Sequence, residues 1–227
     1  MVTGWLIAMV SFAVMDWAAV ARGWRFVRYV TKPAALLALM VWFWQLGGGQ
    51  GFLLWFLLAL VFSWLGDVFL LLPDRFFQAG LVSFLLAHIF YLVGFNLLPP
   101  RLSGAALILL AVVAVAIWAV VPRVVRGVRS RPETRPLTWQ VLAYSAVISL
   151  MLYSALLNLL RPDWPLASAL VTAAGAALFF TSDSILATKR FVRSLPYDEV
   201  AVIVTYHLGQ LAIIWGVLMA FSGLTQS

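Results

Sequence analysis

The sequence predicts an all-α membrane protein, a polytopic bundle of eight transmembrane helices that forms a single transmembrane domain over residues 1–227. Three observations support this fold class. Hydrophobic residues make up 64% of the chain, charged residues only 10%, and the mean hydropathy is +1.03. Soluble globular domains carry about 25% charged residues. The apolar residues also fall into eight runs, most of them close to the roughly 20 residues that a helix needs to cross a bilayer. The connections between runs are too short to fold as separate domains.

The eight apolar runs define the expected spans. In chain order they cover residues 2–21, 33–46, 52–72, 76–96, 104–121, 137–160, 166–188 and 197–221. The first run is apolar from its start and reaches spanning length, so we expect it to be retained as a span rather than cleaved as a signal peptide. The second run is the shortest. The longest connection, 122–136, is rich in arginine.

The distribution of basic residues predicts the orientation. Thirteen of the fifteen Lys and Arg residues fall on one side of the predicted bundle: Arg22, Arg25, Arg28, Lys32, Arg75, Arg123, Arg126, Arg129, Arg131, Arg135, Lys189, Arg190 and Arg193. Only Arg101 and Arg161 fall on the other. Because basic loops stay in the cytoplasm, both termini are expected outside it, in a multi-pass protein of a cell membrane such as the bacterial inner membrane. This asymmetry also explains the net charge of +7 without a nucleic-acid partner.

Two aspartates inside apolar runs are the first candidates for a functional site. Asp67 and Asp183 lie in runs that contain no Lys or Arg to neutralise them. A charged carboxylate at the centre of a membrane helix costs about 2.5–3.5 kcal/mol even on insertion scales, so such residues usually have a function. Each lies five residues before the cytoplasmic end of its run, which places both about 8 Å below that boundary.

Three further ionisable residues are predicted to lie near these aspartates. Asp16 falls at a similar depth in the first run, and His88 and His207 lie deeper, roughly 15–18 Å from the same boundary. Together these groups would line a polar cavity open to the inner leaflet. No metal site is predicted, because the chain has only two histidines and no cysteine.

The two halves of the chain share a pattern that is consistent with a parallel four-plus-four repeat. Asp67 and Asp183 each lie on the third helix of a half, and His88 and His207 follow on the fourth. Both halves would enter the membrane in the same direction, which implies a repeat about an axis along the membrane normal.

Several segments resemble a known family. These are GDVFLLLPDRFFQAGLVSFLLAHIFYLVGF at 66–95, FFTSDSILATKRF at 179–191 and TYHLGQLAI at 205–213, with TKP at 31–33 before the second run. In order and spacing they resemble the YhhN-like lysoplasmalogenase family over most of the chain. The resemblance implies an eight-span membrane hydrolase that cleaves the vinyl ether bond of lysoplasmalogens to a fatty aldehyde and a glycerophospho-base. Its partners would be a lysophospholipid substrate and the lipid bilayer, with no cofactor; the oligomeric state is not implied.

The predicted chemistry fits two buried carboxyl groups. Vinyl ether hydrolysis begins with a proton delivered to carbon, which forms an oxocarbenium ion that water then captures. Desolvation favours the protonated form of a carboxyl, so one of Asp67 and Asp183 can act as the acid. The other can stabilise the cation, as in the paired carboxylates of glycosidases. The sequence does not say which residue takes which role.

A second set of residues is expected to support the aspartates. His88 and Tyr91 share one helix face, as do Tyr206 and Gln210. Together with His207, these groups would hold a carboxyl or a water, although interhelical hydrogen bonding without catalysis is the alternative. The basic residues Lys32, Lys189 and Arg190 would stand at the cytoplasmic rim, where they either bind a lipid phosphate or only set the topology.

The sequence is also compatible with two other functions. Intramembrane acids and a duplicated bundle also occur in small-solute or proton-coupled transporters. Against this function, the spans lack paired Gly or Pro breaks and the acids lie towards one face. A lipid-binding scaffold without activity would leave the aspartates unexplained.

Overall fold

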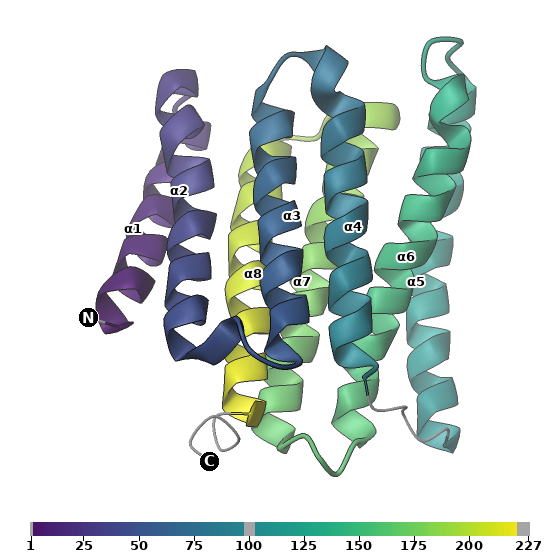
Figure 1. The fold of residues 1–227 in the computed structure, drawn as a ribbon. Helices are drawn as coiled ribbons and strands as arrows, with labels where there is room; N and C mark the ends of the chain where they lie inside the picture. The colour runs from purple at the N-terminus through teal and green to yellow at the C-terminus, as the bar shows by residue number, and fades with distance from the viewer. Residues whose placement is uncertain (1, 98–102, 222–227) are drawn as a thin grey trace.

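The computed structural model describes residues 2–97 and 103–221, which form a bundle of long helices (Figure 1). Over these residues, eight helices are long and apolar enough to cross a membrane, and no strand occurs. The predicted fold class and number of spans are therefore confirmed.

The helices run in chain order as follows. They are α1 (Val2–Ala21), α2 (Arg25–Phe43), α3 (Leu53–Leu71), α4 (Phe77–Phe95), α5 (Gly104–Arg129), α6 (Thr138–Leu157), α7 (Leu166–Phe191) and α8 (Asp198–Phe221). A π-helical turn at Trp44–Gly48 extends α2, and short 3₁₀ turns precede α4 and α6.

Two helices extend by eight residues beyond their predicted runs, and both contain a proline. The second span was predicted to begin at residue 33, but α2 begins at Arg25 and continues through Pro33. The fifth was predicted to end at 121, but α5 continues through Pro122 to Arg129. A proline removes one backbone hydrogen bond and bends a helix without necessarily ending it. The correction matters for Lys32, which lies within α2 and not in a loop.

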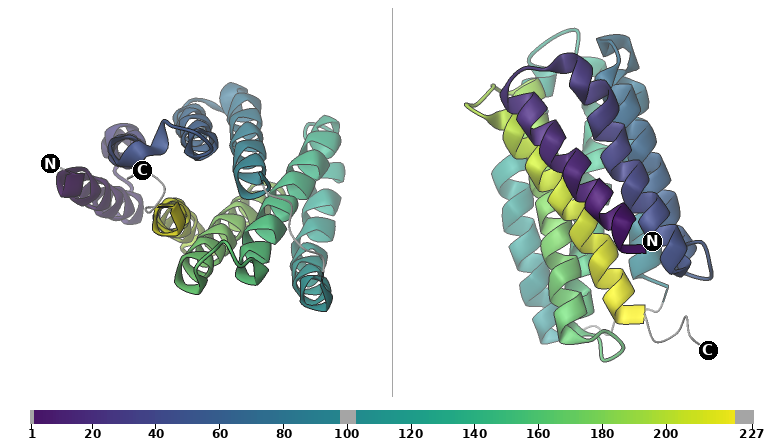
Figure 2. Two further views of the ribbon diagram at one scale, coloured as in Figure 1. Left: turned by 60° about the horizontal axis from the view of Figure 1, so that its bottom comes forward. Right: turned by 90° about the vertical axis from the view of Figure 1, so that its left-hand side faces the viewer.

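The helices form two rows when the bundle is viewed from one end. The left panel of Figure 2 shows α2, α3 and α4 in one row and α8, α7 and α6 in the other. Helix α1 packs against α2 and α8 at one end of the rows, and α5 packs against α6 and α7 at the other. The third and fourth helices of each half are adjacent.

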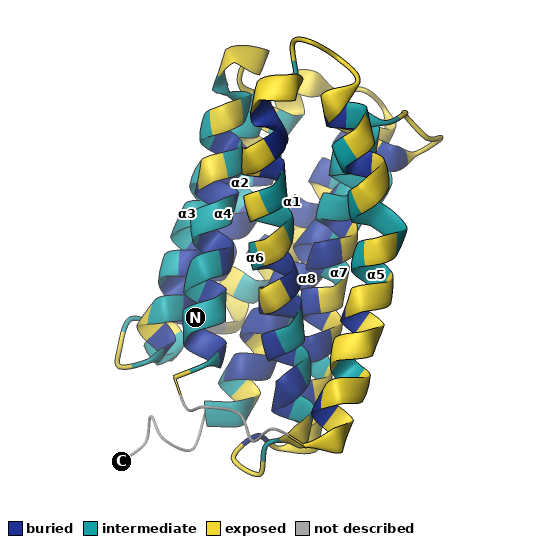
Figure 3. Ribbon diagram, turned by 90° about the vertical axis from the view of Figure 1, so that its right-hand side faces the viewer, coloured by how far each residue is buried: buried dark blue, intermediate teal, exposed yellow. Residues whose placement is uncertain are grey.

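Burial divides the bundle into a dense interior and an apolar exterior. Figure 3 shows buried residues facing inwards and exposed residues covering the outer faces, above all on α5. Large apolar side chains on the exterior, such as Phe26, Trp118 and Trp139, are 89%, 74% and 77% exposed. Because a soluble protein would not expose so much contiguous apolar surface, this exterior suits the hydrocarbon of a bilayer.

Close contact between α7 and α8 depends on glycine. A Cβ atom on Gly175 would lie 2.6 Å from the Ile213 nitrogen, and one on Gly209 would lie 2.9 Å from the Phe179 nitrogen. Small residues allow membrane helices to approach at backbone distance. This contact fixes the position of the α8 polar residues relative to those of α7.

Candidate active site

Asp67 lies in a closed cluster that is formed by three helices. Its Oδ1 is 2.9 Å from the Lys32 Nζ of α2, and its Oδ2 accepts a 2.7 Å hydrogen bond from the Tyr206 hydroxyl of α8. The Asp67 side chain is fully buried, and that of Lys32 is only 10% exposed. The cation that neutralises Asp67 therefore comes from a neighbouring helix.

Asp183 lies in a second cluster that is formed by the other three central helices. Its Oδ2 accepts a hydrogen bond from the Tyr144 hydroxyl of α6 and lies 3.6 Å from the His88 Nε2 of α4. No Lys or Arg among the described residues forms an ion pair with Asp183. Its side chain is 13% exposed, whereas that of His88 is 1% exposed.

Hydrogen bonding fixes the protonation pattern of His88. Its Nδ1 lies 2.6 Å from the Phe84 carbonyl oxygen, which can only accept, so Nδ1 carries a hydrogen. The second nitrogen, Nε2, faces Asp183 and has no hydrogen-bond partner. In the neutral ring Nε2 is an acceptor that lies just beyond hydrogen-bond distance of Asp183, so a shift of a few tenths of an ångström would let it accept the hydrogen of the protonated carboxyl.

Aromatic rings connect the two clusters. The ring centroids of Tyr206 and Phe179 are 5.4 Å apart, and those of Phe179 and His88 are 4.7 Å apart. The Tyr91 ring centroid lies 6.3 Å from that of Phe179, and the Tyr91 hydroxyl donates a 2.5 Å hydrogen bond to the Gln210 Oε1. The predicted supporting residues Tyr91, Gln210, Tyr206 and His88 are thus brought together, although the two aspartates do not contact each other.

The contacts cross between the two halves of the chain. Asp67 of the first half is bound by Tyr206 of the second, and Asp183 of the second half lies against His88 of the first. Each aspartate also contacts the second helix of its own half, through Lys32 or Tyr144. The parallel repeat itself stays a prediction, because α1 packs against α8 whereas α5 packs against α7.

His207 and Asp16 have partners other than the two aspartates. The Trp17 Nε1 donates to the His207 Nδ1 at 3.1 Å, which ties α1 to α8. Asp16 accepts a 2.9 Å hydrogen bond from the Thr31 hydroxyl and lies 3.9 Å from Arg28. In the part of the chain that the structure describes, no hydrogen bond or ion pair joins His207 to Asp67 or Asp183.

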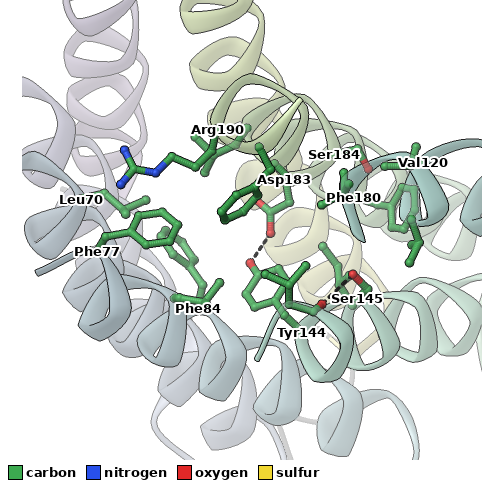
Figure 4. Close-up of a pocket in the computed structure, with 18 residues that line it drawn as sticks. Leu70, Phe77, Phe84, Val120, Tyr144, Ser145, Phe180, Asp183, Ser184 and Arg190 are labelled. Atoms are coloured by element: carbon green, nitrogen blue, oxygen red, sulfur yellow. Dashed lines mark hydrogen bonds between the residues drawn. The ribbon is translucent and has the colours of Figure 1, made fainter. Parts of the chain in front are cut away.

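A cavity opens beside Asp183 (Figure 4). The space inside it that a water-sized molecule can reach is about 70 Å³. Its lining comes from five helices and includes Leu70, Phe77, Phe84, Val120, Val124, Tyr144, Ile148, Phe180, Asp183 and Arg190. Figure 4 shows Asp183 directed towards Tyr144, with Arg190 separated from both along α7. The wall is therefore mostly apolar, and the charged side chains among its lining residues are Asp183 and Arg190.

Potential metal-ligating side chains are dispersed over the described part of the chain. Over residues 2–97 and 103–221, no three His, Asp or Glu side chains gather closely enough to hold an ion.

The chain matches the profile of the YhhN family over residues 27–217. This protein belongs to the YhhN family. It is 30% identical over 194 residues to lysoplasmalogenase TMEM86B of Mus musculus, covering 85% of this chain and 76% of the mouse protein. It is 29% identical over 182 residues to lysoplasmalogenase TMEM86A of Homo sapiens, covering 76% of this chain and 71% of the human one. No solved structure matches the chain.

The structure of this YhhN-family protein adds one residue that the sequence did not indicate. Tyr144 lies in none of the segments that carry the family resemblance, and its helix shows no polar pattern that distinguishes it from Tyr153, whose hydroxyl donates to a backbone carbonyl. Only the packing of α6 against α7 brings Tyr144 to Asp183.

The three basic residues expected at the rim separate in the structure. Lys32 is buried against Asp67. Lys189 lies 2.5 Å from Glu199 and 3.7 Å from Asp198 at the start of α8. Of the three, only Arg190 lines the cavity.

Proposed function

We propose that this YhhN-family protein is a membrane hydrolase that cleaves the vinyl ether bond of lysoplasmalogens, with Asp183 as the general acid. Two observations support the proposal. Its relatives in mammals are named lysoplasmalogenases. Asp183 is a carboxyl group in the wall of an apolar cavity, beside a histidine nitrogen that has no other partner. The proposed mechanism depends on the second observation, the position of Asp183 in the cavity wall beside His88.

The first step transfers a proton to carbon. The alkenyl chain of the substrate lies in the apolar cavity, with its double bond beside Asp183. The proton shared by Asp183 and His88 moves to the vinyl carbon remote from oxygen, and an oxocarbenium ion forms. The carboxylate left behind then faces that cation, so Asp183 supplies both the acid and the counter-charge.

The second step returns the proton. Water adds to the oxocarbenium carbon and gives its proton to the Asp183–His88 pair, which restores the starting state. The resulting hemiacetal collapses when its hydroxyl proton passes to the ether oxygen and the carbon–oxygen bond breaks. The products are a fatty aldehyde and a glycerophospho-base, and no proton is gained or lost overall.

Asp67 acts as a positioning residue in this scheme. Lys32 already compensates its charge, and Asp67 is not among the residues that line the cavity. It holds the Tyr206 hydroxyl, and the Tyr206 ring packs against Phe179 beside His88. Loss of Asp67 would leave Lys32 as an uncompensated buried charge, which disrupts this support.

The proposed orientation follows from the charge asymmetry. The ends of the helices that carry Arg28, Arg126 and Arg190 lie in the cytoplasm, and both termini lie outside it. The cavity then opens in the inner half of the bilayer, where a lysophospholipid can enter from the side.

Product analysis tests the function. Purified protein in detergent is incubated with an alkenyl lysophospholipid, and aldehyde and glycerophospho-base are measured by mass spectrometry. We expect both products in equal amounts, and none from the matching saturated alkyl ether. Equal hydrolysis of an ester analogue, or release of the head group alone, would contradict the proposal.

A further inference from the structure

Asp183 and Arg190 occupy one face of α7. They are seven residues apart, close to two helical turns, and both line the same cavity. The Arg190 side chain is 38% exposed and that of Asp183 is 13% exposed, so the guanidinium lies nearer the opening. A ligand in this cavity therefore meets a carboxyl group inside and a cation at the mouth.

The spacing between these two groups matches a specific ligand length. Seven residues of α-helix rise about 10 Å. In a lysoplasmalogen, seven bonds separate the carbon that accepts the proton from the phosphorus. An extended chain advances about 1.2 Å per bond, which gives roughly 8 Å. The flexible arginine side chain can cover the difference.

The guanidinium is held in place by weak contacts that a ligand can replace. The Arg190 Cζ lies 4.7 Å from the centroid of the Phe77 ring, which also lines the cavity. The Arg190 nitrogens lie 3.3 Å from Asp74, whose side chain is 83% exposed. Exposed ion pairs contribute little to stability, whereas a phosphate offers a bidentate acceptor.

We propose that Arg190 binds the substrate's own phosphate and so selects lysophospholipids over neutral alkenyl glycerols, with Asp74 as a competing anion. This inference rests on the proposed function for the identity of the substrate. Lys189 is excluded from this role because it pairs with Glu199 and does not line the cavity.

Binding of ligands that resist hydrolysis tests this proposal. The two probes are a saturated 1-O-alkyl lysophospholipid and the 1-O-alkylglycerol of the same chain length, titrated into purified protein in a phosphate-free maltoside detergent. For Arg190→Gln we expect at least tenfold weaker binding of the phospholipid and less than a twofold change for the alkylglycerol. Arg193→Gln is the matched control, because Arg193 is not among the residues that line the cavity, and it should change neither affinity. Asp74→Asn should tighten binding of the phospholipid two- to fivefold.

Three results would overturn the proposal. Equal weakening for both ligands would mean that Arg190→Gln damages the cavity itself. Unchanged phospholipid binding would remove Arg190 from recognition. If Arg190→Gln weakened phospholipid binding selectively in phospholipid bilayers but not in detergent, Arg190 would bind the phosphates of bulk lipid and not that of the substrate. Because neither probe is hydrolysed, a failure to form aldehyde from the alkenyl lipid would refute the proposed function and leave this binding result standing.

Discussion

Replacing Asp183 with asparagine removes the proposed acid with the least disturbance to the site. Asparagine has almost the same volume, and its carbonyl can still accept the hydrogen bond from Tyr144. It cannot supply an acidic proton or carry a charge. General acid catalysis is typically worth 10²–10⁴ in rate, or about 2.7–5.4 kcal/mol at 1.36 kcal/mol per factor of ten. We therefore expect kcat to fall at least a hundredfold.

The Michaelis constant and the fold should change little in this variant. The cavity keeps its shape, so KM should remain within about threefold, and the protein should elute as a single species in detergent. Ser184→Ala is the matched control: Ser184 is adjacent and also lines the cavity, whereas the hydrogen bond to Asp183 comes from Tyr144. The assay is the steady-state rate of aldehyde release. More than a tenth of wild-type kcat in Asp183→Asn, a loss below about 1.4 kcal/mol, would refute the assignment of Asp183 as the acid.

Three further outcomes are expected. Asp67→Asn should lower kcat at least tenfold. Adding Lys32→Gln should recover part of that loss, because the second change removes the uncompensated charge. Purely additive losses in the double variant would argue against a role of Asp67 through its pair with Lys32. Single cysteines at Gly49 and Ser130 should react with an impermeant thiol reagent from opposite sides of the membrane, and labelling from one side would contradict the predicted topology. Gly175→Ala should lower the Tm measured in detergent, because the new Cβ would lie 2.6 Å from the Ile213 nitrogen. Gly4→Ala is the control and should leave the Tm unchanged, because a Cβ at Gly4 meets nothing within 4 Å.

Hydropathy was sufficient to predict the number of helices, because each apolar run must satisfy its backbone hydrogen bonds internally within a membrane. It did not give the helix ends. The second apolar run begins at Pro33 and the fifth ends just before Pro122, yet α2 continues through Pro33 and α5 through Pro122. The resulting error placed Lys32 in a loop and concealed its contact with Asp67.

The candidate site was only partly predictable for a related reason. Asp67, Asp183, His88 and Tyr206 stand out in the sequence as polar residues in apolar surroundings or as parts of the family motifs. Their partners depend on how the helices pack, which spacing along the chain does not report. The sequence therefore paired the two aspartates with each other, whereas the structure gives each one separate partners and leaves only Asp183 open to the cavity.

Carbon protonation is the central claim, and solvent deuterium measures it directly. The protein is incubated with an alkenyl lysophospholipid in deuterated water, and the aldehyde is trapped by reduction and examined by mass spectrometry. We predict one deuterium on the carbon next to the carbonyl, and oxygen from labelled water in the aldehyde but not in the glycerophospho-product. An aldehyde without deuterium at that carbon, or labelled oxygen in the phosphate, would contradict the account.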